Sequence, residues 1–187
     1  ACLVSLQCYA ARPTLFRLAV FFLLYALSFG NHLAMILLIV PFGLFLLQTS
    51  STPRQLFRPR VALMAVAIAA LGALQYWPNF MAVWRSIDAP DGAVTRVATF
   101  WFDVTKQDRR ESMVMGVRSD QILDRLGLWW FDFRQQFGWP GIPFAMAGVI
   151  ALWRLSRPWA ILAAGTYAIS TLFALTYYVG DTHVFFL

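Results

Sequence analysis

The chain has 187 residues, of which 60% are hydrophobic, 17% aromatic and only 13% charged. A soluble globular domain has about 25% charged residues, so this composition excludes that class and predicts an all-α, polytopic membrane protein. The net charge of +6 does not indicate a nucleic-acid-binding protein, because the basic residues lie between apolar segments and form no dense patch.

Both ends of the sequence suggest a piece of a longer protein. The chain begins at Ala1 and ends on an apolar Val-Phe-Phe-Leu segment, so we expect an internal fragment. Cys2 and Cys8 have no accompanying set of metal ligands, and they predict neither a zinc site nor a disulfide. We expect both to be buried thiols.

The longest uncharged segment runs from residue 18 to residue 53. Its apolar part, 18–47, would form a single helix about 45 Å long, half again the thickness of a ~30 Å hydrocarbon core. Gly30, Asn31 and His32 interrupt this part with a flexible backbone and two polar side chains. We therefore predict a helical hairpin with its tip at Asn31-His32. Its two spans are 18–30 and 32–47.

Three further apolar segments predict spans at 61–80, 139–153 and 159–179. The first ends in an interfacial aromatic group, Tyr76 and Trp77, followed by Pro78. Small residues recur along it at a spacing of three or four, which would let a neighbouring helix approach closely. These small residues are Ala62, Ala65, Ala69, Gly72 and Ala73.

One long polar region, residues 81–137, carries as many acidic as basic side chains. Two parts of it predict amphipathic helices that lie on the membrane surface. The clearer one begins after Ser119, which would cap it, and ends before Gly138 and Pro140. Its broad apolar face consists of Ile122, Leu123, Leu126, Trp129, Trp130 and Phe133.

The charge distribution predicts the orientation of the five spans. One side receives only basic residues, namely Arg12, Arg17, Arg54, Arg58, Arg60, Arg154 and Arg157. Short loops rich in Arg face the cytoplasm, so we predict that this side is cytoplasmic. The hairpin tip, the loop 81–137 and residues 180–183 would then share the exoplasmic side. If 18–47 formed one span, Arg12 and Arg17 would lie on the opposite side of the membrane from Arg54, Arg58 and Arg60.

Polar side chains on the exoplasmic side, at the mouth of a helix bundle, are candidate binding residues. The candidates are Asn31, His32, Arg134, Asp181 and His183. Each also has a purely structural interpretation, as a helix cap, a loop residue or a partner of an interfacial neighbour. No nucleotide-binding, metalloprotease or serine-hydrolase motif occurs, and we expect no metal site. The residues alone predict only a polytopic membrane protein with an exoplasmic polar site.

Three stretches taken together resemble a known family. They are LSFGNHLAMILLIVPFGLFLL, then FWFDVTKQDRRESMV leading into FDFRQQFGWPGI, and finally FALTYYVGDTHVFFL. They are similar to polytopic membrane proteins grouped with the GT-C-type glycosyltransferases, which include protein O-mannosyltransferase-like members. The resemblance covers most of the chain, and its motifs are short but occur in a specific order.

The resemblance implies an enzyme that moves a sugar, with mannose among the candidates, from a polyprenyl-phosphate carrier to a protein or glycan acceptor on the exoplasmic side. Such chemistry needs an acidic base for the acceptor hydroxyl and donors for the leaving phosphate. In this family the base lies on the first exoplasmic loop, which implies that it precedes this fragment. The catalytic residue is therefore not assigned here, and no other cofactor is implied.

The family pattern matches at two short motifs, Gly30-Asn31-His32 and Gly180-Asp181. The resemblance implies that His32 and Arg134 donate to the lipid phosphate and that Asn31 orients the sugar or the base. Asp181 would bind a sugar hydroxyl or hold His32.

A non-enzymatic class remains open, a transporter or an assembly subunit of a membrane complex. Transporters tend to carry ionisable groups near the bilayer midplane. Every charged residue here lies outside the predicted spans, which favours chemistry at the membrane surface.

Overall fold

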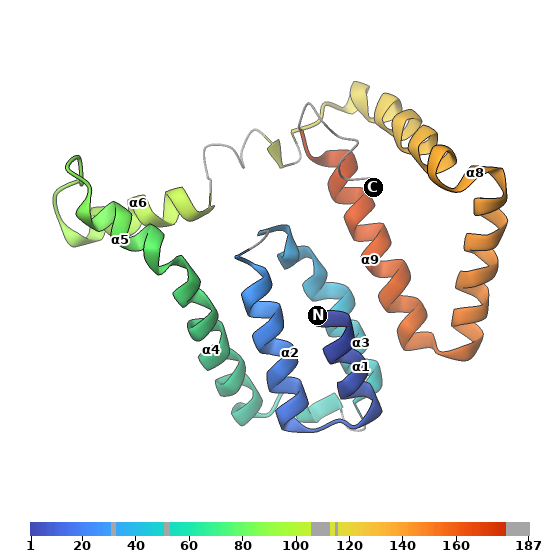
Figure 1. The fold of residues 1–187 in the computed structure, drawn as a ribbon, viewed down its shortest axis with the longest axis horizontal. Coiled ribbons are helices and arrows are strands. Elements are labelled where there is room, and N and C mark those ends of the chain that lie inside the picture. The colour runs from blue at the N-terminus through green and yellow to red at the C-terminus, as the bar shows by residue number, and fades with distance from the viewer. Residues whose placement is uncertain (31–32, 51–52, 106–112, 115, 179–187) are drawn as a thin grey trace. The chain divides into compact units, whose positions relative to one another are not determined.

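The computed structural model describes residues 1–30, 33–50, 53–105, 113–114 and 116–178. Every regular element within these ranges is a helix, which confirms the all-α prediction (Figure 1). Two helices are long and apolar enough to cross a membrane, Pro59–Arg85 and Arg157–Thr176. The remaining apolar helices of the described residues are shorter, so the five predicted spans stay a prediction.

The helices of the first half follow one another closely. They are α1 (Cys2–Ala11), α2 (Leu15–Ser28), η1 (Leu33–Leu38), α3 (Ile39–Thr49), η2 (Pro53–Gln55), α4 (Pro59–Ala73), η3 (Leu74–Tyr76), α5 (Trp77–Arg85) and α6 (Ala93–Thr105). Helix α2 begins three residues before the predicted span, because the Thr14 side chain caps it by accepting from the Arg17 amide. The turn η1 precedes α3 because Pro41 has no amide hydrogen and is tolerated only in the first turn of a regular helix.

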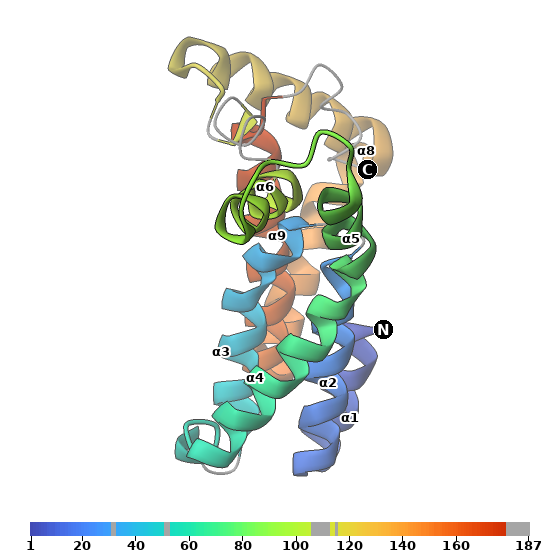
Figure 2. The ribbon, with the colours of Figure 1, turned by 90° about the vertical axis from the view of Figure 1, so that its left-hand side faces the viewer.

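Helices α2 and α3 run in opposite directions (Figure 1, Figure 2). The ring of Phe42 packs edge-on against Phe21 and Tyr25, with 5.5 Å between centroids in each pair. The Tyr25 hydroxyl also donates to the Met35 carbonyl oxygen over 2.8 Å. The chain therefore reverses direction between α2 and η1, as the predicted hairpin requires. The predicted tip, Asn31-His32, lies outside the described residues.

Helix α4 packs closely against α2 through a glycine. A Cβ atom added at Gly72 would lie only 2.7 Å from the Ala26 Cβ, so this contact excludes any larger residue. The predicted close approach is confirmed at Gly72, which is buried, whereas Ala62, Ala69 and Ala73 are exposed. The difference arises because only one face of α4 meets α2, while the small residues extend around the helix.

The predicted span 61–80 lies within a longer helical segment, Pro59–Arg85, so the aromatic group at Tyr76 and Trp77 does not end the helix. The chain makes one 3-10 turn, η3, and continues as α5, in which Pro78 occupies the first helical turn. Proline is compatible with that position because the amide hydrogens there have no helical acceptor. Helices α5 and α6 then pack through Phe80, whose ring lies 5.0 Å from Trp84 and 5.4 Å from Phe100.

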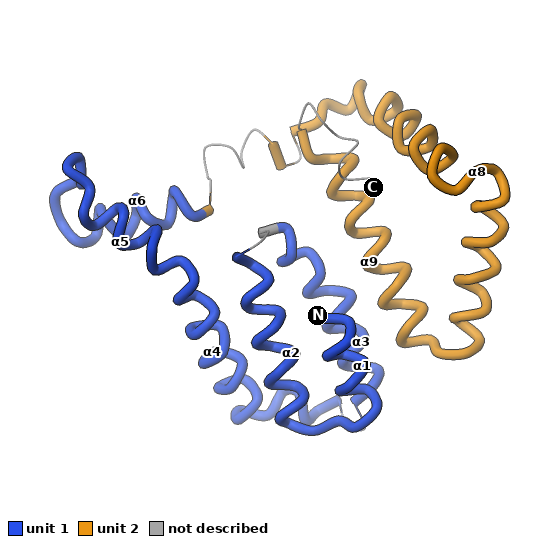
Figure 3. The backbone as a smooth tube through the Cα atoms, in the orientation of Figure 1, with its two compact units in different colours: residues 1–104 blue, residues 105–187 orange. Residues whose placement is uncertain are grey.

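The chain divides into two compact units, residues 1–104 and residues 105–187 (Figure 3). The second unit contains η4 (Ser119–Gln121), α8 (Ile122–Leu155) and α9 (Arg157–Thr176). Gly138 adopts φ 64° and ψ −177°, so α8 consists of two segments that meet there. A positive φ favours glycine, and the predicted end of the amphipathic helix at Gly138 is confirmed. The prediction of one membrane domain over 1–187 stays a prediction.

Two boundaries in the second unit differ from expectation. Ser119 begins the 3-10 turn η4, and the N-cap position of α8 is occupied by Gln121, whose side chain makes no capping hydrogen bond. Helix α9 ends at Thr176, three residues before the predicted end at 179. In the first unit, Cys2 is half-buried and Cys8 is exposed, so the expectation that both thiols are buried is wrong for Cys8.

The connections α1–α2 and α3–α4 lie at the same end of the first unit. The Tyr9 hydroxyl and the Ser50 hydroxyl are 2.9 Å apart and share a hydrogen bond. Nearby, Arg17 Nη1 donates to the Cys8 carbonyl oxygen over 2.6 Å. These two connections and the first turns of α2 and α4 carry five of the arginines assigned above to the cytoplasmic side, Arg12, Arg17, Arg54, Arg58 and Arg60. We call this surface the arginine end; its orientation in a membrane stays a prediction.

Candidate functional site

The C-terminal end of α2, which leads into the predicted hairpin tip, is held by side chains from η3. Gln75 Nε2 donates to the Ala26 carbonyl oxygen over 3.2 Å, and the Tyr76 hydroxyl donates to the Phe29 carbonyl oxygen over 2.9 Å. Carbonyl groups in the last turn of a helix lack their usual helical partner. The Ala26 oxygen also accepts from the Phe29 amide over 3.4 Å, so the Gln75 bond adds to a long helical bond, while Tyr76 supplies a partner for the Phe29 oxygen. Both donors stabilise the helix end where it is.

Gly30 lies directly against the first of these donors, Gln75. A Cβ atom at Gly30 would collide with the side-chain amide of Gln75. The close approach of Gln75 therefore requires glycine at this position, apart from any need for backbone flexibility. Together, Gln75 and Tyr76 fix the backbone immediately before Asn31-His32.

The C-terminal end of α9, which leads into the second motif, is held by an arginine from α8. Arg125 Nη1 donates to the carbonyl oxygens of Tyr177, over 2.8 Å, and Ala174, over 3.4 Å. A basic side chain is favourable at a helix C-terminus, where the free carbonyls carry partial negative charge. The next residue, Tyr178, donates its amide hydrogen to the Met113 carbonyl oxygen over 2.7 Å. The backbone that leads toward Gly180-Asp181 is thus tied to the second unit.

Arg134, the one candidate residue that the structure describes, lies beside the bend in α8. Its guanidinium stacks on the Trp139 ring, 4.8 Å from the centroid. The turn at Gly138 places Trp139 edge-on to Trp130, with 6.2 Å between their centroids. Arg134 is therefore held by a cation–π contact while its side chain remains exposed.

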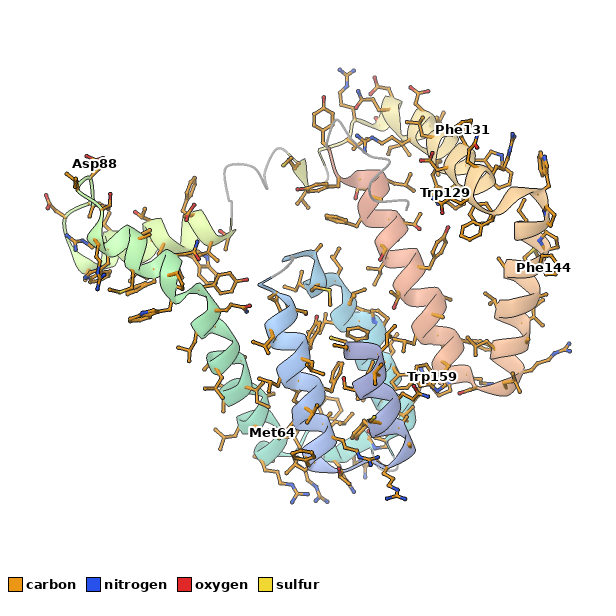
Figure 4. The ribbon with its side chains drawn as sticks, in the orientation of Figure 1. Met64, Asp88, Trp129, Phe131, Phe144 and Trp159 are labelled. Atoms are coloured by element: carbon orange, nitrogen blue, oxygen red, sulfur yellow. The ribbon has the colours of Figure 1, made fainter. Side chains whose placement is uncertain are left out.

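Further aromatic rings extend this cluster along the first segment of α8. The Phe133 ring lies between Trp130, at 6.1 Å, and Phe137, at 5.2 Å. Phe137 is 58% exposed and Trp139 is 65% exposed, so the cluster forms a surface and not a core. Trp129 and Phe131 lie on opposite sides of α8, as their spacing of two residues requires (Figure 4).

The other four candidates, Asn31, His32, Asp181 and His183, lie outside the described residues. The structure therefore shows the side chains that hold the helix ends before the two motifs. That the five candidate residues form one site stays a prediction. Three residues that hold helix ends were not predicted from the sequence to do so. They are Gln75, Tyr76 and Arg125. The available signals were an amide residue inside an otherwise apolar span and a basic residue within the broad apolar face of α8.

Within the described residues, no group of three or more His, Cys, Asp and Glu side chains could hold a metal ion. Comparisons of the chain with protein-family models, curated proteins and solved structures found no match. Functional inference consequently depends on the residues of this chain and on the sequence motifs that they form.

Proposed function

We propose that this chain belongs to an integral membrane glycosyltransferase of GT-C type. The enzyme transfers a sugar, with mannose as the first to test, from a polyprenyl-phosphate carrier to a protein or glycan acceptor on the exoplasmic side. One observation carries the proposal: the two motifs of the resemblance, Gly30-Asn31-His32 and Gly180-Asp181, each follow a helix end held by side chains of another element. Such anchoring suits residues that must keep a defined position for chemistry.

The proposal includes five membrane spans, at 18–30, 32–47, 61–80, 139–153 and 159–179. The arginine end is cytoplasmic in this arrangement. Gln75 and Tyr76, which hold the opposite end of α2, then lie toward the exoplasmic surface, as does the hairpin tip. The co-location of five arginines at one end of the first unit supports this orientation.

In the transfer step, the acceptor hydroxyl attacks the anomeric carbon and the polyprenyl phosphate leaves. An upstream carboxylate takes the hydroxyl proton, while His32 and Arg134 donate hydrogen bonds to the leaving phosphate. Asn31 orients the sugar or the base, and Asp181 binds a sugar hydroxyl or holds His32. The stacked position of Arg134 on Trp139 supports its role, because the contact limits the side-chain motion that phosphate binding would otherwise have to restrict.

The direct test is to incubate membranes containing the full-length protein with labelled polyprenyl-phosphate sugars and to score which label moves and onto which acceptor. His32→Ala and Asp181→Ala should each lower the transfer rate at least about tenfold with expression intact, as loss of one transition-state contact predicts. Arg118→Gln is the control, since Arg118 is exposed and pairs only locally with Asp120. Transfer at the wild-type rate in both variants would dismiss the site, and no transfer of any sugar would favour a transporter or an assembly subunit.

The aromatic surface of α8 is the proposed guide for the carrier chain. Replacing Trp129 and Trp130 by Ser should raise the KM for the lipid donor more than the KM for the acceptor, because the lipid is the substrate that this role places against the rings. Phe131→Ser is the matched control, since Phe131 lies on the opposite side of the helix from Trp129. Equal changes in the two KM values would remove this role.

A further inference from the structure

The arginine end carries uncompensated positive charge. Residues 1–87 contain no Asp or Glu, so no carboxylate in the spans and connections around this end can neutralise it. The first acidic residue, Asp88, lies at the turn between α5 and α6, at the other end of the first unit from the start of α4 (Figure 4). A cluster of this kind attracts anions, and the attraction is strongest close to the surface.

A pocket opens within the arginine end, between the α1–α2 and α3–α4 connections. Its cavity volume is about 70 Å³, and the cavity is open to the surface. Its polar lining includes Tyr9, Thr14, Gln55 and Arg60. The Thr14 oxygen accepts from the Arg17 amide, so the Thr14 hydroxyl proton is available for an anion. A guanidinium, an amide and a hydroxyl are the donors that a phosphate oxygen requires.

The remainder of the pocket lining is apolar. Leu15, Leu18, Leu56 and Val61 contribute to it. The residues next in sequence to Leu15 and Leu56 are also apolar, and Phe16 is 77% exposed and Phe57 is 74% exposed. Donors beside exposed aromatic and aliphatic groups match an amphiphile, whereas a free anion would use only the donors.

We propose that this pocket binds the headgroup of an anionic phospholipid. Arg60 and Gln55 donate to the phosphodiester, the apolar wall contacts the glycerol and upper acyl groups, and the surrounding arginines add long-range attraction. This site is separate from the residues assigned to sugar transfer, and the inference does not depend on that function. Charge complementarity and the apolar wall together select a lipid over a soluble phosphate.

The test uses the full chain purified in a neutral detergent and titrated with phosphatidylglycerol or phosphatidylcholine, with bound lipid counted by native mass spectrometry. Phosphatidylglycerol should bind about fivefold more tightly, the effect of one basic residue at a charged membrane surface. Arg60→Gln should reduce this preference to less than about twofold. Arg85→Gln, at the far end of the same long helix, should retain the full preference.

Gln55→Glu provides a second variant, in which Arg60 is unchanged and a different residue of the pocket lining is altered. Gln55 is exposed, so the change should be compatible with the fold while placing a negative charge in the pocket and weakening phosphatidylglycerol binding about threefold or more. Equal binding of the two lipids, or equal losses in Arg60→Gln and Arg85→Gln, would overturn the proposal. Displacement of phosphatidylglycerol by an excess of inorganic phosphate would also overturn it, in favour of a simple anion site.

Discussion

At the C-terminal ends of both α2 and α9, carbonyl oxygens accept hydrogen bonds from side chains of another element, but the donors differ in chemistry. In both helices the accepting carbonyls belong to an alanine two residues before the last helical residue and to the residue that caps the helix. In α2 these are Ala26 and Phe29, and in α9 they are Ala174 and Tyr177. Neutral donors serve the first helix and a guanidinium serves the second.

The surroundings explain the difference. The end of α2 lies within the uncharged segment 18–53, which supplies no carboxylate to pair with a charged donor, so neutral donors avoid an unpaired charge there. The end of α9 lies beside the polar start of α8, where Arg125 is only half-buried and keeps part of its hydration. A helix end can thus be anchored by neutral or charged donors, and the local polarity selects which.

The largest effect should come from separating α4 from α2. Gly72→Leu forces the helices apart at Ala26, and it removes both neutral donors from the end of α2. Overpacking costs about 1–3 kcal/mol and each lost hydrogen bond about 1 kcal/mol, so the free energy of unfolding should fall by about 3–5 kcal/mol. Reversible unfolding in detergent, monitored by circular dichroism, measures this free energy of unfolding. Gly43→Leu is the control, because a Cβ at Gly43 has no neighbour within 4 Å; equal losses would contradict the packing role of Gly72.

The next largest effect should come from the charged anchor. Arg125→Met retains much of the side-chain length but removes the bonds to Tyr177 and Ala174, which should cost about 1.5–3 kcal/mol. Hydrogen exchange at the Tyr178 amide should accelerate, since that residue follows the released helix end. Arg118→Met is the control, because it removes only an exposed ion pair worth less than about 1 kcal/mol. Unchanged hydrogen exchange at the Tyr178 amide in Arg125→Met would show that the α9 end does not need this arginine.

The smallest effects should come from the neutral donors taken singly. Gln75→Leu and Tyr76→Phe should each lower the free energy of unfolding by about 0.6–1.5 kcal/mol, the range for single hydrogen bonds in apolar surroundings. The double variant measures their coupling, because both act on one helix end. Tyr167→Phe, on the exposed side of α9, should change stability by less than about 0.5 kcal/mol. A Tyr76 variant no less stable than the Tyr167 variant would show that the Phe29 carbonyl does not need this donor.

The candidate site could be predicted only in part. Arg134 is a candidate because of its place on the predicted exoplasmic side and in one stretch of the resemblance, but its stacking on Trp139 depends on the bend at Gly138. Sequence shows that glycine interrupts the helix and does not show where the next segment then points. Gln75 and Arg125 were missed for a related reason: whether a polar residue supports a helix end depends on which distant carbonyl lies within reach.

Composition and hydropathy alone determined that the chain is helical and rich in apolar segments, because these properties are sums over many residues and tolerate local error. The interruption at Gly30 and the spacing of small residues on α4 also followed from local chemistry. Only the tertiary structure decided that Gly72 meets Ala26, that η3 continues into α5, and that Gln75, Tyr76 and Arg125 hold helix ends. The contacts of Gly72, Gln75, Tyr76 and Arg125 join groups far apart in sequence, and their energies depend on distances that no local pattern records.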